Sequence, residues 1–436
     1  MRWMTRMATW TWLAALACTG SAASAATFTV NTADDNCSLL RMCLRRAIAF
    51  ANLTAETDTI VFDIPGDPDT PRRITLASPI AATQPVVIDG YTQPGASPNT
   101  LAEGTNAQIR IVIDGSAISD RPVLSVWRGP SEVRGVSLVG GYYGFQIGYT
   151  AAEVNLRGSF VGVEADGVTA TPNLWGVQVD GEFNVIGGTN PADRNLVSGN
   201  TRSGVVLYGS ASIRNAVVGN LIGTNRHVEP VLGNGWSGVQ VAGARLSRIG
   251  GYSSALQNVI AGNRDEGVYL IWGVDRTLYN VEVISRVFDN ATTSGAIDDG
   301  YPHANDAGDA DDGPNELLNH PIITTATLDN GQLAIAGTLD TNPNRIYRVA
   351  LFGNTRACKP SRGGEAERFI GYVTVAADAA GHAAFQWNGA APASGYVSVA
   401  AQAGTGQEDI YVDSTSRIGP CVPVTAGDRI FANGFQ

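Results

Sequence analysis

Residues 258–263 read NVIAGN, and a similar succession of asparagine, a mostly apolar run, glycine and asparagine occurs at 195–200 (NLVSGN) and 215–220 (NAVVGN). Recurrence of one motif at intervals of about 20 residues or more indicates a repeat architecture, in which each unit stacks on its neighbours. The repeat therefore has to be interpreted before any single residue is considered.

Short strand-like segments accompany the repeated asparagines. GVQVDG at 176–181 returns as GVQVAG at 238–243, and both alternate apolar with polar residues and stop at glycine. Helical segments that would alternate with such strands in an α/β fold are missing. Coils of about 20 residues, built from short strands and tight turns, predict a parallel β-helix with about 12 coils between 26 and 297.

Asparagine and glycine suit the corners of such coils because they tolerate left-handed backbone geometry. We expect Asn195, Asn215 and Asn258 to form a ladder of side-chain hydrogen bonds along the coils; the alternative is that they line a ligand groove. In the strand that follows Asn258, one of Val259 and Ile260 is expected to face a dry core.

The N-terminal residues have the pattern of a secretory signal. Arg2 and Arg6 precede an apolar run, and Ala23-Ser24-Ala25 matches an A-x-A cleavage site, so residues 1–25 are expected to be a signal peptide. Later segments have no run of 18 apolar residues, so no transmembrane segment is expected. The predicted location is extracellular, on the outer-membrane surface or periplasmic.

Export also explains the cysteines. Removal of the signal leaves Cys37, Cys43, Cys358 and Cys421, an even number that predicts disulfides in an oxidising compartment. The natural pairing is local, Cys37 with Cys43 and Cys358 with Cys421. Neither pair has the C-x-x-C spacing of a zinc or redox site.

Residues 26–60 are expected to form an N-terminal cap. Within 38–52, Leu40, Leu44 and Ile48 recur at four-residue spacing, which predicts an amphipathic helix that covers the first coil.

The segment from Cys43 to Ile48, CLRRAI, resembles the N-terminal CSLREA motif of bacterial secreted proteins, although Arg46 replaces the usual Glu and the Ser after Cys is absent. VIDGYTQPGASPN at 87–99 and the IGG and GNLIGT phrases are similar to repeats of the same group. The resemblance implies a right-handed parallel β-helix of the pectate-lyase-like superfamily with a C-terminal β-sandwich.

The C-terminal third also predicts a sandwich without the resemblance. Alternating strands such as QLAIAGTL and RIYRVALFG follow Asn330-Gly331 and are separated by Gly, Asn, Pro and Asp turns. The predicted fold is all-β: a capping helix, a parallel β-helix over 61–297, an acidic connector over 298–320, an antiparallel β-sandwich over 321–424 and a tail over 425–436.

The charge and lysine content of the chain limit which partners and catalytic mechanisms are expected. A net charge of −11 excludes a nucleic-acid partner, because such binding depends on cations that neutralise phosphates. Lys359, the single lysine, lies outside the β-helix and excludes lysine-based lyase mechanisms. Four arginines are other candidates for a lyase site: Arg110, Arg134, Arg157 and Arg194.

Paired carboxylates are what a glycoside hydrolase requires. Asp180 with Glu182 and Asp265 with Glu266 are candidate pairs, but both lack the phrases of the galacturonan hydrolases, and a solvated face is the simpler interpretation. The same holds for the loop histidines His227, His303 and His320.

The acidic connector carries the best signal for an ion site. Hard oxygen ligands in a glycine-rich loop suit Ca²⁺, although the register of an EF-hand loop is broken; the alternative is an exposed acidic linker. The expected ligands of a structural Ca²⁺ are Asp306, Asp309, Asp311, Asp312 and Asn315.

Two functions follow from these observations. The lack of catalytic motifs favours a noncatalytic secreted or cell-surface protein for adhesion or for binding an extracellular polysaccharide or a cell-surface glycan. The alternative is an enzyme, a lyase, hydrolase or epimerase of uronic-acid glycans. Convergence of acidic groups and an arginine on one concave sheet face would favour the enzyme.

Overall fold

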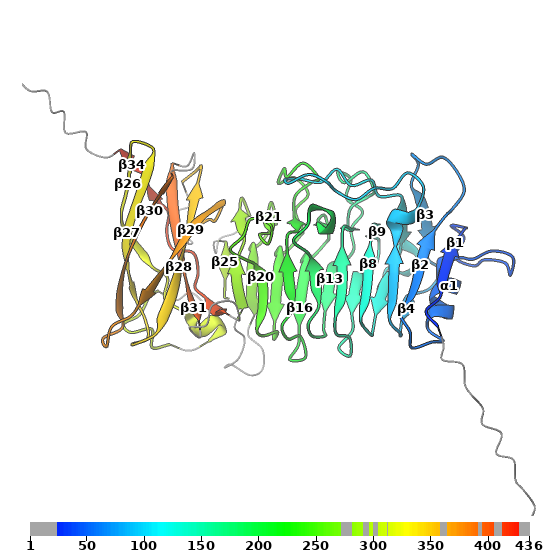
Figure 1. Cartoon of the computed structure of the whole chain (residues 1–436), viewed down its shortest axis with the longest axis horizontal. Helices are drawn as coiled ribbons and strands as arrows, with labels where there is room; N and C mark the ends of the chain where they lie inside the picture. The colour runs from blue at the N-terminus through cyan, green and yellow to red at the C-terminus, as the bar shows by residue number, and fades with distance from the viewer. Residues whose placement is uncertain are drawn as a thin grey trace, which may run out of the picture.

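The computed structural model describes residues 24–271, 281–290, 296–299, 304–311, 313–357, 364–390, 395–404 and 412–426. The first part of the described chain is a parallel β-helix, and an antiparallel β-sandwich follows it (Figure 1). The predicted fold class is confirmed. The signal peptide, apart from its last two residues, lies outside the described residues, as do His303, Asp312, Cys358, Lys359 and the end of the predicted tail.

Each coil of the β-helix contributes to three parallel sheets, here named A, B and C. Sheet A contains β1 (Thr27–Val30), β2 (Asp58–Phe62), β5 (Val86–Asp89), β8 (Ser131–Arg134), β11 (Val154–Arg157), β14 (Val185–Gly187), β17 (Ala216–Val218), β20 (Ser247–Gly250) and β23 (Val281–Ile284). Sheet B contains β3 (Arg72–Thr75), β6 (Ile111–Asp114), β9 (Val136–Val139), β12 (Phe160–Val161), β15 (Leu196–Val197), β18 (Leu221–Ile222), β21 (Val259–Ala261) and β24 (Arg286–Phe288).

Sheet C contains β4 (Ile80–Ala82), β7 (Leu124–Val126), β10 (Tyr143–Ile147), β13 (Trp175–Val179), β16 (Val205–Tyr208), β19 (Val239–Ala242), β22 (Val268–Ile271) and β25 (Ile297–Asp298). Short 3₁₀ turns interrupt the loops at η1 (Gly90–Thr92), η2 (Ser116–Ile118) and η3 (Pro191–Asp193), and a fourth, η4 (Pro314–Leu317), lies in the connector.

Equivalent side chains of successive coils stack in rows. In sheet B the register aligns Val197, Ile222 and Ile260, which all lie in the main core inside the coils. The alternate row of sheet B, which includes Leu221 and Val259, is also buried, in a second apolar cluster on the outside of the sheet. As expected, only one of the two, Ile260, faces the core inside the coils; Val259 points outward and is nevertheless buried, because loops cover the outer face of this sheet.

Buried asparagines form ladders at the corners of the coils, as predicted. The Asn195 ladder runs from Asn195 to Asn220 and Asn258. Each side-chain amide donates a hydrogen bond of 2.9 Å to the side-chain carbonyl oxygen of the next asparagine. Four similar bonds of 2.9–3.1 Å build the Asn173 ladder, which contains Asn173, Asn200, Asn234, Asn263 and Asn290.

The ladders correct the expected coil length. Asn215 does not belong to the Asn195 ladder; it accepts a bond from Asn184 at a different corner. The motif interval of about 20 residues thus separates two corners of one coil. Successive ladder residues are 25 and 38 positions apart at Asn195, Asn220 and Asn258, so the coils are longer and fewer than predicted.

Helix α1 (Leu44–Ala51) caps the first coil and buries Leu44, Ala47, Ile48 and Ala51. Cys37 and Cys43 form the predicted disulfide, and Cys43 is the extended residue at which the helix begins. Leu40 therefore lies in the loop of the disulfide and is 94% exposed, contrary to its expected place on the helix. The pairing of Cys421 with Cys358 remains a prediction, because Cys358 lies outside the described residues.

A long loop, here called the strap (residues 93–110), crosses the outer face of sheet B (Figure 1). Arg194 donates to the strap carbonyls of Leu101, Ala102 and Gly104 at 3.0, 2.9 and 2.7 Å. Ala107 and Ile109 of the strap lie in the same apolar cluster as the outer row of sheet B. The strap thus explains why both rows of this sheet are buried.

The β-sandwich has two sheets around a core of its own. One contains β26 (Ile322–Asp329), β27 (Gln332–Asp340), β30 (His382–Ala390) and β34 (Thr425–Ala426). The other contains β28 (Ile346–Asn354), β29 (Arg368–Ala376), β31 (Tyr396–Gly404), β32 (Val412–Thr415) and the short β33 (Val422–Pro423).

The sandwich covers the last coil of the β-helix. The hydroxyl of Thr415 accepts a 2.9 Å bond from Val283 N in the last strand of sheet A, and Ala366 forms an antiparallel bridge with Val287 of sheet B. Phe352 and Ile418 of the sandwich belong to the main core of the coils. The open end of the β-helix is therefore closed by the sandwich.

Candidate functional site

The outer face of sheet C carries a row of polar side chains. The register aligns Ser125, Gln146 and Gln178 on successive strands, and the row continues through Val206 to Gln240. Inner positions of the same strands hold the core residues, because side chains alternate across a strand. This row, which is polar except at Val206 and is buried except at the half-buried Gln146, runs along the β-helix on the outside of sheet C, here called the sheet C face.

Aromatic residues flank this row on the side where the strands begin. Trp175 lies beside Tyr143 in the register, and its ring is 5.1 Å from the ring of Trp236 in an edge-to-face arrangement. The guanidinium of Arg202 lies over both indoles, 5.0 Å from the Trp175 ring and 4.6 Å from that of Trp236. These cation–π contacts orient the two indoles and place a cation beside both of them.

A second set of aromatic residues lies where the strands end. Trp127 packs edge-to-face on Tyr149, with their ring centroids 5.7 Å apart, and Tyr208 ends β16. Tyr149 and Tyr208 are largely exposed. The polar row therefore has amphipathic aromatic side chains on both sides.

Asp180 is an acidic group of this face. It follows β13, and its carboxylate accepts hydrogen bonds from the amides of Gln178 and Gln146, at 2.5 and 3.3 Å. Burial raises the pKa of Asp180 against the opposing effect of these two bonds. The pKa of Tyr143 is raised to about 12, first by burial and then by neighbours that include Asp180, whereas Arg202 lowers it. Asp180 and Arg202 therefore have opposite effects on the pKa of Tyr143.

The two members of each carboxylate pair expected from the sequence differ in their exposure to solvent. Glu182 is exposed at the corner after Asp180, and Asp265 is exposed beside the half-buried Glu266. Ser237 donates a 3.0 Å bond to Glu266, whose pKa is raised mainly by burial and to a lesser extent by Asp298 and Asp265.

The four arginines that the sequence suggested for a lyase site make contacts away from the sheet C face. Arg110 donates 2.7 Å to Pro68 O, Arg134 pairs with Asp89 at 2.8 Å on sheet A, and Arg194 holds the strap. Arg157 also belongs to sheet A, with Asp193 at 3.8 Å.

The acidic connector brings together three of its predicted ligands. One carboxylate oxygen from each of Asp306, Asp309 and Asp311 lies within 4.8 Å of the others. Burial raises the pKa of Asp309 to about 7, and the neighbouring charges of Asp306, Asp311 and Glu316 act in the same direction. Asp309 is held by Asn319 N at 2.7 Å and by the Asn342 amide at 2.8 Å.

Asn315 has a different position from the one predicted. Its carbonyl oxygen accepts from Val281 N at 2.7 Å, and its amide donates to Val281 O and Thr415 O, both at 2.9 Å. These bonds join the last strand of sheet A to the sandwich. Asn315 thus serves the junction between the two modules, and Asp312 lies outside the described residues.

The sequence did not identify Trp175, Trp236 and Arg202 as site residues. A signal was present, because a tryptophan stands just before each copy of the GVQV repeat, in LWGVQV and WSGVQV. The signal became meaningful only with the register, which aligns β13 and β19 through β16 on one sheet.

The described part of the chain contains no helix with the length and hydropathy needed to cross a bilayer. No protein-family model matches the chain, and no curated protein matches it in sequence.

Proposed function

We propose that this protein is an exported, noncatalytic β-helix protein that binds an extracellular polysaccharide or cell-surface glycan along the sheet C face. The observation that carries the proposal is the row of amide and hydroxyl groups, interrupted at Val206, between two sets of aromatic side chains. The secretory pattern of residues 1–25 and the resemblance to secreted CSLREA-motif proteins support an extracellular, outer-membrane or periplasmic location.

The chemistry of the face suits a sugar chain. Tryptophan and tyrosine present flat apolar surfaces that pack on the C–H faces of pyranose rings, while their polar edges remain hydrated. A side-chain amide such as that of the half-buried Gln146 both donates and accepts hydrogen bonds, as sugar hydroxyls do. Because coils repeat at about 4.8 Å, these groups follow an extended ligand over several coils.

The test is binding of the purified protein to a panel of neutral and uronic-acid polysaccharides, measured by affinity electrophoresis. Trp175→Ala and Trp236→Ala are expected to weaken retention at least tenfold. Phe183→Ala is the matched control, because Phe183 is also an exposed aromatic residue with an arginine, Arg214, 5.6 Å from its ring. No retention on any glycan, or an equal loss in the control, would contradict the proposal.

A polysaccharide-active enzyme is the second candidate, and one observation favours it. Asp180 has a raised pKa and shares the face with Arg202, which is the combination of an acid and a cation that sugar chemistry uses. Chain shortening or unsaturated products during incubation, lost in Asp180→Asn, would establish the enzyme. Retention without turnover would support the binding protein.

We also propose that Asp306, Asp309 and Asp311 bind a structural Ca²⁺. The support is the approach of their oxygens to within 4.8 Å, together with the hard oxygen chemistry that this ion prefers. The ion would hold the connector in place where the β-helix ends and the sandwich begins, and it would take no part in chemistry on sheet C.

A further inference from the structure

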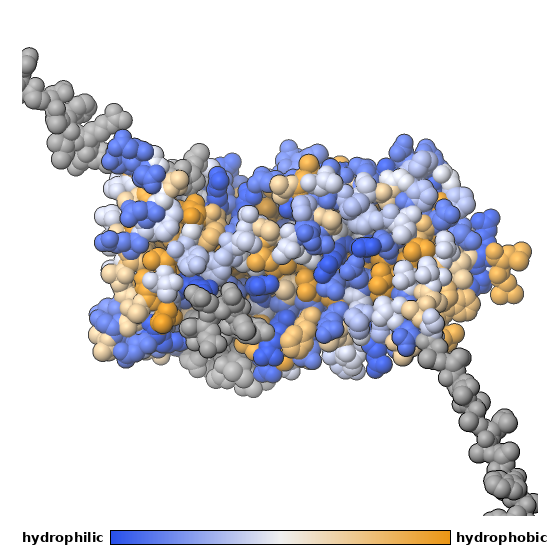
Figure 2. Space-filling view, in the orientation of Figure 1, coloured by the Kyte–Doolittle hydropathy of each residue, from blue (hydrophilic) through white to orange (hydrophobic). Residues whose placement is uncertain are grey.

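The N-terminal end of the molecule carries two adjacent leucines that are almost completely exposed. Leu39 is 93% and Leu40 is 94% exposed, in a loop that projects beyond α1 (Figure 1). Figure 2 shows this projection as an apolar cluster beyond the end of the rod. Isolated exposed leucines are ordinary, but an adjacent pair on a projecting loop is typical of an interaction site.

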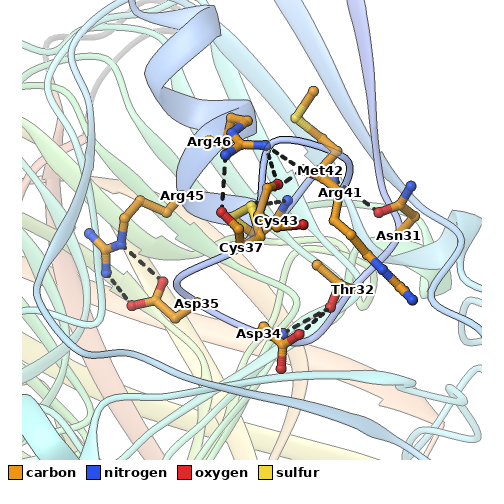
Figure 3. The surroundings of a disulfide bond; sticks show 11 residues. Asn31, Thr32, Asp34, Asp35, Cys37, Arg41, Met42, Cys43, Arg45 and Arg46 are labelled. Carbon is orange, nitrogen blue, oxygen red and sulfur yellow. Dashed lines mark hydrogen bonds and ion pairs between the residues drawn. A yellow bond between two sulfur atoms is a disulfide. The ribbon is translucent and has the colours of Figure 1, made fainter.

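The loop is fixed in shape. The disulfide Cys37–Cys43 closes it into a ring, here called the leucine tip (residues 37–43), and Arg46 of α1 donates to three of its carbonyls (Figure 3). These bonds measure 2.6 Å to Ser38 O, 2.5 Å to Arg41 O and 3.0 Å to Cys37 O.

Hydrogen bonds between Met42 and Asn31 also attach the leucine tip to the segment that follows β1. Met42 O accepts from Asn31 N at 2.9 Å, and Met42 N donates to the Asn31 side chain at 3.0 Å. The leucines are therefore presented on a preorganised ring, so little conformational entropy is lost when the tip binds.

Arginines outnumber acidic residues around the leucine tip, where Asp34 and Asp35 are the nearby carboxylates, in a chain that is acidic as a whole. Arg41, Arg45 and Arg46 stand within six positions of each other, whereas the net charge of the protein is −11. Arg45 is neutralised by Asp35 at 2.6 Å, but Arg46 contacts backbone carbonyls, and Arg41 is exposed. Two guanidinium groups thus remain close to the apolar pair.

We infer that the leucine tip inserts into the interfacial region of an anionic lipid bilayer. A projecting apolar pair bordered by arginines combines the two contributions that drive interfacial binding, apolar burial and attraction to acidic headgroups. A convex tip also contacts a flat, deformable surface without requiring a pocket. This inference is independent of glycan binding, because the tip lies at one end of the rod and the sheet C face along its side.

The experiment is co-sedimentation of the purified exported protein with vesicles of phosphatidylcholine and phosphatidylglycerol in a 3:1 ratio. The double variant Leu39→Ser/Leu40→Ser is expected to bind at least tenfold more weakly than the wild type. Leu53→Ser is the matched control, because Leu53 is 78% exposed just after α1 but outside the ring, and it is expected to bind as the wild type does.

Two further measurements separate the contributions of charge and insertion. Arg41→Gln, or vesicles of phosphatidylcholine alone, are expected to weaken binding severalfold. The emission of a Leu39→Trp variant is expected to shift to shorter wavelength with anionic vesicles, compared with a protein carrying Leu53→Trp. Circular dichroism establishes that all variants are folded.

Failure of the wild type to sediment with anionic vesicles would overturn the inference, as would equal binding of the double serine variant. Sedimentation velocity tests the competing occupant, a second copy of the chain. A wild-type dimer that becomes a monomer in the double serine variant would assign the tip to self-association and would also overturn the inference.

Discussion

The carboxylate of Glu103 lies 3.3 Å from the guanidinium of Arg286, although 183 positions separate them in the chain. Glu103 belongs to the strap, which leads into β6 near the start of sheet B, and Arg286 begins β24, the last strand of that sheet. One loop therefore connects the early coils of the β-helix directly to its last coil.

Arg194 is expected to contribute more to the strap than Glu103 does. Arg194→Ala removes a charged donor from three strap carbonyls and should lower the free energy of unfolding by about 2–3 kcal/mol. Glu103→Gln is the control, because an ion pair with a 77% exposed partner contributes less than about 1 kcal/mol. Urea unfolding measures both, and equal effects would contradict this account of the strap.

The Asn173 ladder is expected to be sensitive to a single atom. The Asn263 amide donates to Asn290 Oδ1 at 2.9 Å, so Asn263→Asp places a carboxylate oxygen against a carbonyl oxygen in a buried corner. We expect a loss of about 3 kcal/mol or more. The matched substitution Asn388→Asp, on the exposed face of β30, should change stability by less than about 0.5 kcal/mol.

Ile260→Asp should be more damaging still. Ile260 lies fully inside the coils, where an unpaired carboxylate costs several kcal/mol. The variant is expected to be recovered unfolded or aggregated, as judged by circular dichroism and sedimentation. Ile260→Val, which keeps the side chain apolar, should fold, with a loss of about 1 kcal/mol. A folded, stable Ile260→Asp protein would contradict the register of sheet B.

Glu282 gives the junction with the sandwich a dependence on pH. Burial raises its pKa to about 7 against the effect of Arg248 and Arg348. The pKa of Tyr252 is raised mainly by burial and, less strongly, by the charge of Glu282. The folded state therefore binds a proton that the unfolded state has lost above about pH 4.5. Its contribution to stability is complete below that pH and is lost as the pH rises through 7.

Glu282→Gln should remove this dependence on pH, because the amide stays neutral at every pH as the protonated carboxyl does. The variant is expected to match the wild type at pH 4 and to be more stable at pH 8, as measured by chemical unfolding at a series of pH values. A variant that is less stable than the wild type at pH 8 would show that Arg248 and Arg348 stabilise the charged carboxylate more than burial destabilises it.

Calcium should raise the thermal midpoint of the wild type, because an ion that binds only the folded state stabilises it by mass action. Asp309→Asn/Asp311→Asn is expected to lose this increment while the circular dichroism of the β-helix is unchanged. Asp329→Asn, an exposed acidic residue at the end of β26, is the control and should keep the increment. Equal midpoints of the wild type in chelator and in millimolar calcium would leave the connector as an acidic linker.

Sequence patterns predicted the β-helix because its corners require the same residue types in every coil. Coil length could not be predicted in the same way, because loops of variable length add residues without changing the corners: Asn220 follows Asn195 after 25 positions, and Asn258 follows Asn220 after 38. Helical spacing suggested that Leu40 lies on α1, but the ring closed by Cys37 and Cys43 imposes a different backbone there.

The sequence predicted the acidic cluster of the connector but not the aromatic residues of the sheet C face, for a similar reason. Asp306, Asp309 and Asp311 are close in sequence, so their approach follows from a single loop. Trp175 and Trp236 are adjacent only because the strands between them stack in register, a relationship that no local pattern contains.

The strap also affects how the rod responds to force. The interstrand hydrogen bonds of a β-helix run along its axis, so a pull between the ends loads one interface between coils at a time and favours sequential unzipping. Because the strap joins early coils to the last coil through Arg194, Arg226 and Arg286, the interfaces between them share the load. This part of the rod is expected to yield in one large step.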